Sequence, residues 1–294
     1  MELKVNNDKG GANSFRRPKK RYRAVLSIAG SDSSGGAGIQ ADLKTFSSLG
    51  VYGATAITAI TAQNTVGVHA QFAIAPEMVQ SQIVAVMEDI EPTAIKVGML
   101  ANAEVAAAVA DVLSRYSIPI ILDPVMVSSS GHRLLSVEAE EVVKSRLLPM
   151  ATLITPNIPE MVALTSMPLT TLDEKLAAAR HLIALGARAV LLKGGHEEGD
   201  IKTDILYRNS AEGIITSHFS APTIATRNIH GTGCTLSSAI AAYVARGLKL
   251  EDAVREAKAY LYEAIKAGAD IAIGRGFGPV NHLFDPLKLE TYEE

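Results

Sequence analysis

The sequence predicts an α/β fold in which helices cover both faces of a mostly parallel sheet. Two observations support this prediction: short β-rich runs alternate repeatedly with longer amphipathic runs, and most of the short runs are apolar throughout. Strands that are apolar on both sides are typical of a sheet with two buried faces. No break in composition interrupts the body, so we predict one domain over residues 23–285. We expect a disordered basic tail, residues 1–22, before it and an acidic tail, residues 286–294, after it.

The predicted strands are short and are either apolar or rich in β-branched residues. The run 24–29 reads AVLSIA, and the run 54–62 reads ATAITAITA, in which β-branched residues alternate with others. Further strands are predicted at 94–97, 118–122 (IPIIL), 152–154 and 189–192 (AVLL). Two more runs, 205–207 and 213–219, are candidates for a hairpin.

The longer runs have the periodicity of amphipathic helices. The helix at 76–90 begins with Pro76, whose missing N–H does no harm in a first helical turn, and the helix at 172–185 ends before Gly186. The other helices are predicted at 41–49, 103–115, 137–148, 234–245 and 252–269.

The composition excludes several classes of protein. The chain has 294 residues with a single cysteine, so it cannot form an internal disulfide or a cysteine-rich metal site by itself. A formal net charge of −3 argues against a general nucleic-acid partner, which would need a basic face. No uninterrupted apolar stretch reaches the roughly 18 residues of a membrane span. We therefore expect a soluble, cytoplasmic protein.

Polar or glycine-bearing clusters follow six successive predicted strands. They are Gly30-Ser31-Asp32, Gln63-Asn64, Gly98-Met99, Asp123-Pro124, Thr155-Pro156-Asn157 and Lys193-Gly194-Gly195. Each cluster alone is also an ordinary turn signal. Ligands of such sheets bind outside the carboxyl ends of the strands, so the six clusters together predict one polar rim. Its glycines, amides, acids and lysine suit a phosphorylated or nucleotide ligand.

The first of two glycine-rich loops covers residues 33–38 and leads into a predicted helix. Gly36-x-Gly38 fits the loose fingerprint of a dinucleotide site. That fingerprint also needs an acid about 20 residues later, and none lies between Asp42 and Glu77. The same glycines also suit a loop that approaches a small substrate closely.

The second loop reads His230-Gly231-Thr232-Gly233-Cys234 and leads into a small, apolar helix. A glycine turn at a helix N-terminus favours an anion, because free N–H groups and the helix dipole both point at it. Cys234 is expected on the first turn, where the dipole lowers the pKa of a thiol. An inert, buried thiol remains the alternative for a lone cysteine.

Seven segments carry a resemblance to a known family. In chain order they are AGSDSSGGAGIQADLKTFSSLG, TAQNT, KVGML, LDPVM, LITPNIPE, LLKGGH and TRNIHGTGCTLSSAIAAY. Over about residues 24–284 the chain resembles the hydroxymethylpyrimidine/phosphomethylpyrimidine kinases of thiamin biosynthesis, in the ribokinase-like superfamily. The resemblance implies a three-layer αβα sandwich, often as a homodimer. It also implies Mg²⁺-assisted, ATP-dependent phosphorylation of 4-amino-5-hydroxymethyl-2-methylpyrimidine and then of its monophosphate.

The resemblance also implies roles for individual residues. The anion hole and the catalytic base are Gly231, Gly233 and Cys234, the cysteine standing where sugar kinases of this superfamily carry an aspartate. The substrate pocket is Gln63, Asp42, Gly30, Met99 and Val125, with the Gln63 amide holding the aminopyrimidine edge. The nucleotide and phosphate positions are Lys193, Asn157 and Thr232, and the magnesium positions are Glu160 and Asn157. One departure is Ile229, where the family usually has threonine.

Three alternatives remain open. The nearest is a pyridoxal kinase of the same fold, or an enzyme that phosphorylates both substrates, because both are flat heteroaromatic hydroxymethyl compounds. The ring amine that Gln63 recognises is absent from pyridoxal, which favours the pyrimidine. A non-catalytic nucleotide or vitamin sensor is the second alternative, and a dinucleotide oxidoreductase, weakened by the missing acid, is the third.

Overall fold

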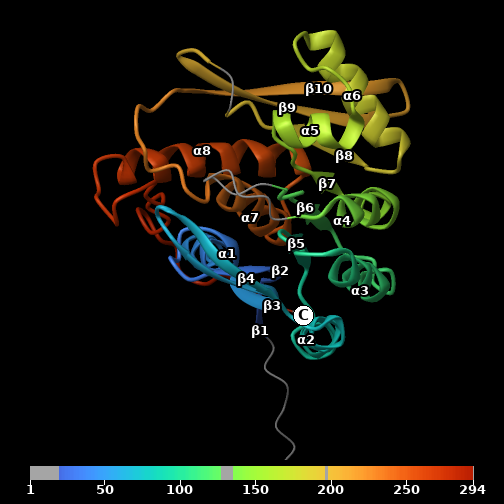
Figure 1. Cartoon of the computed structure of the whole chain (residues 1–294), viewed down its shortest axis with the longest axis vertical. Helices are drawn as coiled ribbons and strands as arrows, with labels where there is room; N and C mark the ends of the chain where they lie inside the picture. Colours follow the sequence, from blue (N-terminus) through green and yellow to red (C-terminus); the bar gives the residue numbers. More distant parts are fainter. Residues whose placement is uncertain (1–19, 127–134, 196–197, 294) are drawn as a thin grey trace, which may run out of the picture.

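The computed structural model describes residues 20–126, 135–195 and 198–293. Within them, nine strands form one sheet in the order β10-β9-β8-β7-β6-β5-β2-β3-β4 (Figure 1). The strands are β2 (Ala24–Asp32), β3 (Tyr52–Asn64), β4 (Gly67–Ala73), β5 (Ala94–Val97), β6 (Ile120–Leu122), β7 (Leu153–Ile154), β8 (Ala189–Leu192), β9 (Ile201–Ser210) and β10 (Gly213–Pro222). From β3 to β8 in this order all neighbours are parallel, whereas β4, β9 and β10 pair antiparallel.

Helices cover both faces of the sheet and give the three layers (Figure 1). One face carries α2 (Pro76–Asp89), α3 (Ala103–Leu113), α4 (Val137–Val142), α5 (Ile158–Thr165) and α6 (Leu172–Ala184). The other face carries α1 (Gly38–Ser48), α7 (Thr232–Ala245) and α8 (Leu250–Gly268). The predicted αβα sandwich and its mostly parallel sheet are confirmed.

The central strands are apolar throughout because each of their faces packs into a different core. On β6, Ile120 and Leu122 join the core under α2–α6, whereas Ile121 joins the core under α1, α7 and α8. Alternate side chains of a strand point to opposite faces, so a strand with two covered faces needs apolar residues at every position.

Several elements differ from the sequence prediction. β4 and α5 were not predicted, and the predicted hairpin is confirmed as β9–β10 but with longer strands. The helix predicted at 137–148 is α4 followed by a π-helical turn, Val143–Leu147, and a 3₁₀ turn, Leu148–Met150. Within the described residues, no helix has the length and apolar character needed to cross a membrane.

The two predicted tails meet at their ordered ends. β1 (Lys20–Tyr22) pairs antiparallel with β11 (Thr291–Glu293) in a separate two-stranded sheet. The guanidinium of Arg23 stacks over the Tyr292 ring at 4.2 Å, which adds a cation–π contact to this pairing. The chain is thus ordered beyond residues 23–285 at both ends, while residues 1–19 of the predicted tail lie outside the described residues.

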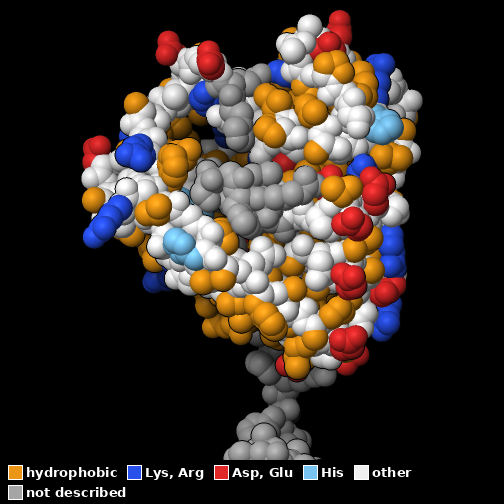
Figure 2. All heavy atoms as spheres, in the orientation of Figure 1, with side chains coloured by type: hydrophobic (Ala, Val, Ile, Leu, Met, Phe, Trp, Pro, Cys, Tyr) orange, Lys and Arg blue, Asp and Glu red, His pale blue; other side chains and the backbone are white. Residues whose placement is uncertain are grey.

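The edge strand β4 and its neighbour β3 expose hydrophobic side chains. Ile60 and Phe72 are cross-strand partners and are 50% and 70% exposed. Figure 2 shows hydrophobic side chains gathered over this end of the sheet.

Candidate active site

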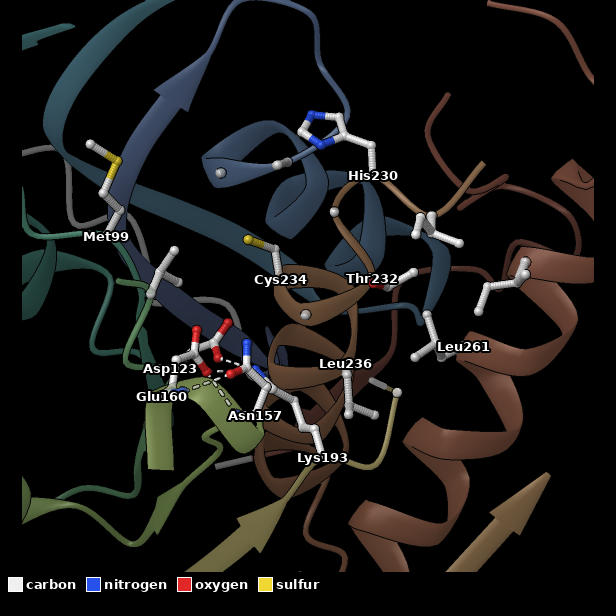
Figure 3. A pocket seen from close by; sticks show the side chains of 18 of the residues that line it. Met99, Asp123, Asn157, Glu160, Lys193, His230, Thr232, Cys234, Leu236 and Leu261 are labelled. Carbon is white, nitrogen blue, oxygen red and sulfur yellow. Dashed lines mark hydrogen bonds and ion pairs between the residues drawn. The ribbon is translucent and has the colours of Figure 1, made fainter. Parts of the chain in front are cut away.

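A cavity of about 730 Å³ opens where the carboxyl ends of the strands meet the start of α7. Its volume lies in the range of small-molecule and cofactor sites. The lining includes eleven of the twelve residues predicted for the site: Gly30, Gln63, Met99, Val125, Asn157, Glu160, Lys193, Gly231, Thr232, Gly233 and Cys234. Ten of the lining side chains are labelled in Figure 3. The predicted rim at the ends of the strands is therefore a single cavity.

The start of α7 forms one wall of this cavity. Gly231 is the N-cap and has the left-handed φ of +81°. A Cβ at this position would lie 1.9 Å from the carbonyl oxygen of Gly36, so only glycine fits against the neighbouring loop. No side chain caps α7, and the first N–H groups of a helix lack partners inside it. The geometry suits an anion at this helix end.

Lys193 lies between two buried carboxylates near the same helix end (Figure 3). Its Nζ is 2.8 Å from Asp123 Oδ1 and 3.6 Å from Glu160 Oε2. Burial disfavours the charge of Lys193, but Asp123 and Glu160 raise its pKa above the ordinary value. Burial also opposes the charge of Asp123, yet the two cations Lys193 and Lys96 hold the pKa of Asp123 below its ordinary value. Lys193 is thus a fixed cation on the wall of the cavity.

The pKa of the Glu160 carboxyl is raised, in contrast to that of Asp123. Its burial raises the pKa of the carboxyl, the neighbouring Asp123 raises it further, and Lys193 acts against both. Asp123 and Glu160 share one lysine, Lys193, so a second cation near Glu160 would stabilise its charged form.

Asn157 and Glu160 form a capping box at the start of α5. The Asn157 side chain accepts a hydrogen bond from the Glu160 N–H at 2.8 Å, and the Glu160 carboxylate accepts one from the Asn157 N–H at 2.7 Å. The spacing Asn-x-x-Glu is a sequence signal for a helix start, and it would have predicted α5. The same pair that the resemblance assigns to magnesium therefore also has a structural role.

The donor set fits a magnesium ion rather than a transition metal. Among the described residues no three His, Cys, Asp or Glu side chains gather as a metal-binding group. Magnesium usually takes one or two protein carboxylates and completes its shell with water and phosphate oxygens. The electron-rich Glu160 carboxylate, beside the Asn157 amide, meets that sparse requirement.

The opposite end of the cavity carries the predicted substrate residues. The Gln63 backbone is fixed by Ser33, whose hydroxyl accepts from the Gln63 N–H at 2.8 Å and lies 2.7 Å from the Gln63 carbonyl oxygen. The Gln63 side-chain oxygen accepts from the Thr61 hydroxyl at 3.1 Å. Met99 packs closely against Gly30, where a Cβ would lie 2.9 Å from the methionine sulfur. This end therefore combines a flat apolar wall with one carboxamide.

Asp42 does not line the cavity, contrary to the prediction. It is completely buried and pairs with Lys96, whose Nζ lies 2.9 and 3.0 Å from the two carboxylate oxygens. A substrate in the cavity would have to displace this ion pair to reach Asp42. Lys96, which the sequence analysis did not select, borders the cavity in its place.

Cys234 lies on the first turn of α7 as predicted, but its thiol is not activated there. Although the side chain is only partly buried, its surroundings raise the pKa of the thiol to about 11. Burial is the largest cause, the Asp42 and Asp123 carboxylates add to it, and Lys96 acts in the opposite direction. The lowered thiol pKa expected from the helix dipole is therefore outweighed by burial.

Two further pairs of side chains shape the cavity, and neither pairing was predicted from the sequence. Asp32, at the end of β2, lies 2.8 Å from the ring Nε2 of His230. Near the other end of the cavity, Lys258 of α8 lies 2.8 Å from Asp204, which also accepts the Gly194 N–H at 2.9 Å. Asp32 is the last residue of β2, so its place in the strand-end rim was the available signal. No local signal joins Lys258 to Asp204.

The sequence of the chain is similar to those of a known family of kinases. A sequence profile of the phosphomethylpyrimidine kinase family matches residues 32–281, which is most of the chain. The chain belongs to the phosphomethylpyrimidine kinase family. This family member is 49% identical over 259 residues to the hydroxymethylpyrimidine/phosphomethylpyrimidine kinase of Rhizobium meliloti, covering 88% of this chain and 96% of that protein. The enzyme of the same name from Escherichia coli is 48% identical over 265 residues, covering 90% and 98%.

Solved structures of kinases resemble the family member in fold. The phosphomethylpyrimidine kinase of Clostridium difficile matches with a TM-score of 0.73 and 44% identity, covering 82% of this chain and 99% of that one. A pyridoxal kinase of Bacillus subtilis, in complex with ADP, matches with a TM-score of 0.80 and 35% identity, covering 89% and 97%. The pyridoxal kinase of Staphylococcus aureus, in complex with AMP-PCP and pyridoxal, matches with a TM-score of 0.80 and 32% identity, covering 93% and 99%. The predicted family, fold and kinase class are confirmed.

Proposed function

We propose that this phosphomethylpyrimidine kinase family member transfers the γ-phosphoryl group of ATP to 4-amino-5-hydroxymethyl-2-methylpyrimidine and then phosphorylates the monophosphate. The observation that carries the proposal is the layout of one cavity. A carboxamide, Gln63, stands at one end, and a helix N-terminus with the fixed cation Lys193 stands at the other. The first end suits an aminopyrimidine and the second suits the phosphates of a nucleotide.

At the substrate end, Gln63 recognises the edge of the ring. A carboxamide both donates and accepts hydrogen bonds, so it pairs with the ring amine and the adjacent ring nitrogen of an aminopyrimidine. Met99 and Val125 provide the apolar wall against the ring face, and Gly30 leaves room beside them.

At the phosphate end, binding is electrostatic. The amides of Gly233 and Cys234 at the start of α7, together with Lys193, stabilise the negative charge on the transferring group. Glu160 and Asn157 would hold the magnesium ion of the nucleotide. When bound, magnesium would supply positive charge that offsets the charge of the phosphate oxygens.

In the reaction, the hydroxymethyl oxygen forms a bond to the γ-phosphorus while the bond from phosphorus to the β–γ bridging oxygen breaks, and ADP leaves. The hydroxyl proton passes to the sulfur of Cys234, which must be in its thiolate form to accept the proton. Since the pKa of this thiol is about 11, only a small fraction is ionised at neutral pH. Positioning and charge stabilisation therefore supply most of the rate enhancement, as is general for phosphoryl transfer.

A second candidate is phosphorylation of pyridoxal, either alone or in addition to the pyrimidine. The observation that favours it is the match to pyridoxal kinase structures, one of which contains pyridoxal and AMP-PCP. Pyridoxal lacks the ring amine, so it would lose the hydrogen bond that an aminopyrimidine donates to the Gln63 carboxamide. A buried polar group left unpaired costs orders of magnitude in discrimination.

The test is an ADP-release assay with Mg-ATP and three substrates side by side: hydroxymethylpyrimidine, its monophosphate and pyridoxal. Turnover of the first two with pyridoxal silent supports the proposal, comparable turnover of pyridoxal supports the second candidate, and silence on all three overturns both. Gln63→Ala is then expected to lower kcat/KM for the pyrimidine more than for pyridoxal. Gln71→Ala, on the exposed strand β4, is the matched control and should change neither.

Two further expectations stay predictions. The homodimer is tested by light scattering on the purified chain. The cytoplasmic location is tested by fractionating cells that express it.

A further inference from the structure

A completely buried ion pair lies beside the cavity and takes no part in the mechanism above. Lys96 comes from β5 and Asp42 from α1, and both side chains have no exposed surface. Burial opposes the charge of Lys96, but Asp42 raises the pKa of Lys96 above its ordinary value, so Lys96 is a permanent cation. Removing two charges from water costs free energy that the pairing seldom exceeds, so such a pair is weak evidence for stability. A functional role is the better explanation.

The Asp42 carboxylate joins four elements of the fold. Its Oδ1 accepts from Lys96 at 3.0 Å and from the Ser238 hydroxyl of α7 at 2.6 Å. Its Oδ2 accepts from Lys96 at 2.9 Å and from the Ser27 hydroxyl of β2 at 2.5 Å. The three side chains that donate to Asp42 therefore come from three different elements, and α7 is one of them.

The cluster lies one helical turn below Cys234. Ser238 follows Cys234 by four positions, so the two side chains share a face of α7 with Cβ atoms roughly 5–6 Å apart. Lys96 and Cys234 both border the cavity. The backbone N–H of Gly38, the first residue of the helix that carries Asp42, also favours the Cys234 thiolate and lowers the pKa of the thiol.

We propose that the Lys96–Asp42 ion pair positions Cys234 for proton transfer: it holds α7 through Ser238 and supplies the fixed charges that govern ionisation of the thiol. Lys96 favours the thiolate and Asp42 opposes it. The catalytic role of this ion pair rests on the proposed function, in which the Cys234 thiolate accepts the substrate proton.

The other charged groups that act on the thiol form a second ion pair, Asp123 and Lys193. Asp123 opposes the thiolate, and Lys193, 2.8 Å from Asp123, partly cancels that effect. Asp123 is also tied to α7, since its Oδ2 lies 3.2 Å from the Ser237 hydroxyl. Neighbouring serines on α7 thus contact the two buried aspartates, each paired with its own lysine.

The test measures the thiol itself and needs neither substrate nor nucleotide. Cys234 is the only cysteine of the chain, so alkylation by iodoacetamide reports on it alone. The rate follows the thiolate fraction, so at pH 8.5 Lys96→Met should react at least tenfold more slowly than the parent. Asp42→Asn should react at least tenfold faster. Ser238→Ala removes the link from Asp42 to α7 but no charge, so it isolates the positioning role and should change the rate less than either charge variant.

Opposite shifts are the signature of a charge effect, because a merely structural role would move both variants in the same direction. Shifts of the same sign, or no shift in either variant, overturn the proposal. If Lys96→Met does not fold, Asp42→Asn decides alone, since asparagine keeps the size and an oxygen acceptor for Lys96. An unchanged or slower rate in that variant then overturns the proposal. Failure of the kinase assay with intact thiol shifts would overturn only the proposed function.

Discussion

Asp32 and His230 are in hydrogen-bond contact at 2.8 Å although 198 positions separate them in the sequence. An ionised carboxylate only accepts, so the His230 Nε2 carries the proton. The same Asp32 carboxylate accepts the backbone N–H groups of Gly36 at 3.1 Å and Ala37 at 2.8 Å. One side chain therefore shapes the glycine-rich loop after β2 and ties it to the loop that begins α7.

These hydrogen bonds keep the Asp32 carboxylate ionised, and they make position 32 sensitive to substitution. Burial opposes its charge, but the bonds from His230, Ser34 and the loop amides lower its pKa to about 2. We expect Asp32→Asn to raise the KM for the pyrimidine about tenfold. The NH₂ group of the asparagine would face hydrogen-bond donors at the place where the carboxylate accepted hydrogen bonds. Steady-state kinetics and the Tm measure the effect, and Ser34→Ala, which removes one hydroxyl, is the milder control. A KM and a Tm equal to those of the parent would contradict this account.

Cys234 is expected to contribute to the rate without being indispensable. Cys234→Ala should lower kcat by about 10²-fold, in the range of general-base effects, and leave weak residual activity. The backbone amides of the first turn of α7 remain in this variant, so the KM for ATP should change little. Cys234→Asp should restore part of kcat, since a carboxylate also accepts a proton. Equal turnover of Cys234→Ala and the parent would refute the base role.

The layers of the fold could be predicted because apolar runs report burial directly. Ile120, Ile121 and Leu122 had to lie in a sheet with two covered faces, and they do. The short strand β4 could not be predicted in the same way. It is an edge strand with exposed residues such as His69 and Phe72, so no hydrophobic alternation marks it.

The strand-end rule placed Gly30, Gln63, Met99, Asn157 and Lys193, because residues that follow parallel strands share one edge of the sheet. The family resemblance, not this rule, assigned Asp42 to the substrate pocket, and Asp42 instead lies on α1 and pairs with the buried Lys96. The partner of Asp42 is a lysine 54 positions away in the sequence. A sequence shows which residues are polar but not which distant side chain neutralises them.

Glu160 allows its two roles to be separated. Glu160→Gln keeps a side-chain oxygen for the Asn157 N–H, since either residue completes a capping box, but it removes the charge. We expect an unchanged helix start and a roughly tenfold higher Mg²⁺ concentration for half-maximal activity, reflecting loss of a single charge-assisted contact.

The chain offers a matched control for this variant. Thr171 and Glu174 form the same capping box at the start of α6, away from the cavity. Glu174→Gln should leave the Mg²⁺ dependence of the ADP-release rate unchanged. The magnesium assignment fails if both variants, or neither, alter that dependence.

His282 should make the fold sensitive to mild acid. It is buried, and burial, with the nearby charges of Lys44 and His230, lowers its pKa from 6.5 to about 4. Its Nε2 lies 3.0 Å from the Thr235 hydroxyl, which itself donates to the Gly231 carbonyl at the start of α7. The neutral ring thus supports the helix end that forms the anion site.

The pH dependence of stability has this direction because the unfolded chain protonates His282 at a higher pH than the folded chain does. As the pH falls below 6.5 the unfolded chain protonates His282 while the folded chain does not, so stability is full above pH 6.5 and is lost progressively toward pH 4. The loss from this group is about 3 kcal/mol across that window. Urea midpoints at pH 7.5 and pH 5 measure it, and His282→Gln, which still donates to Thr235, should reduce the difference. His69→Gln, on the exposed edge strand, should not. Asp32 titrates in a lower window, between 3.8 and about 2, so an equal pH 7.5-to-5 difference in His282→Gln and the parent would show that His282 is not responsible.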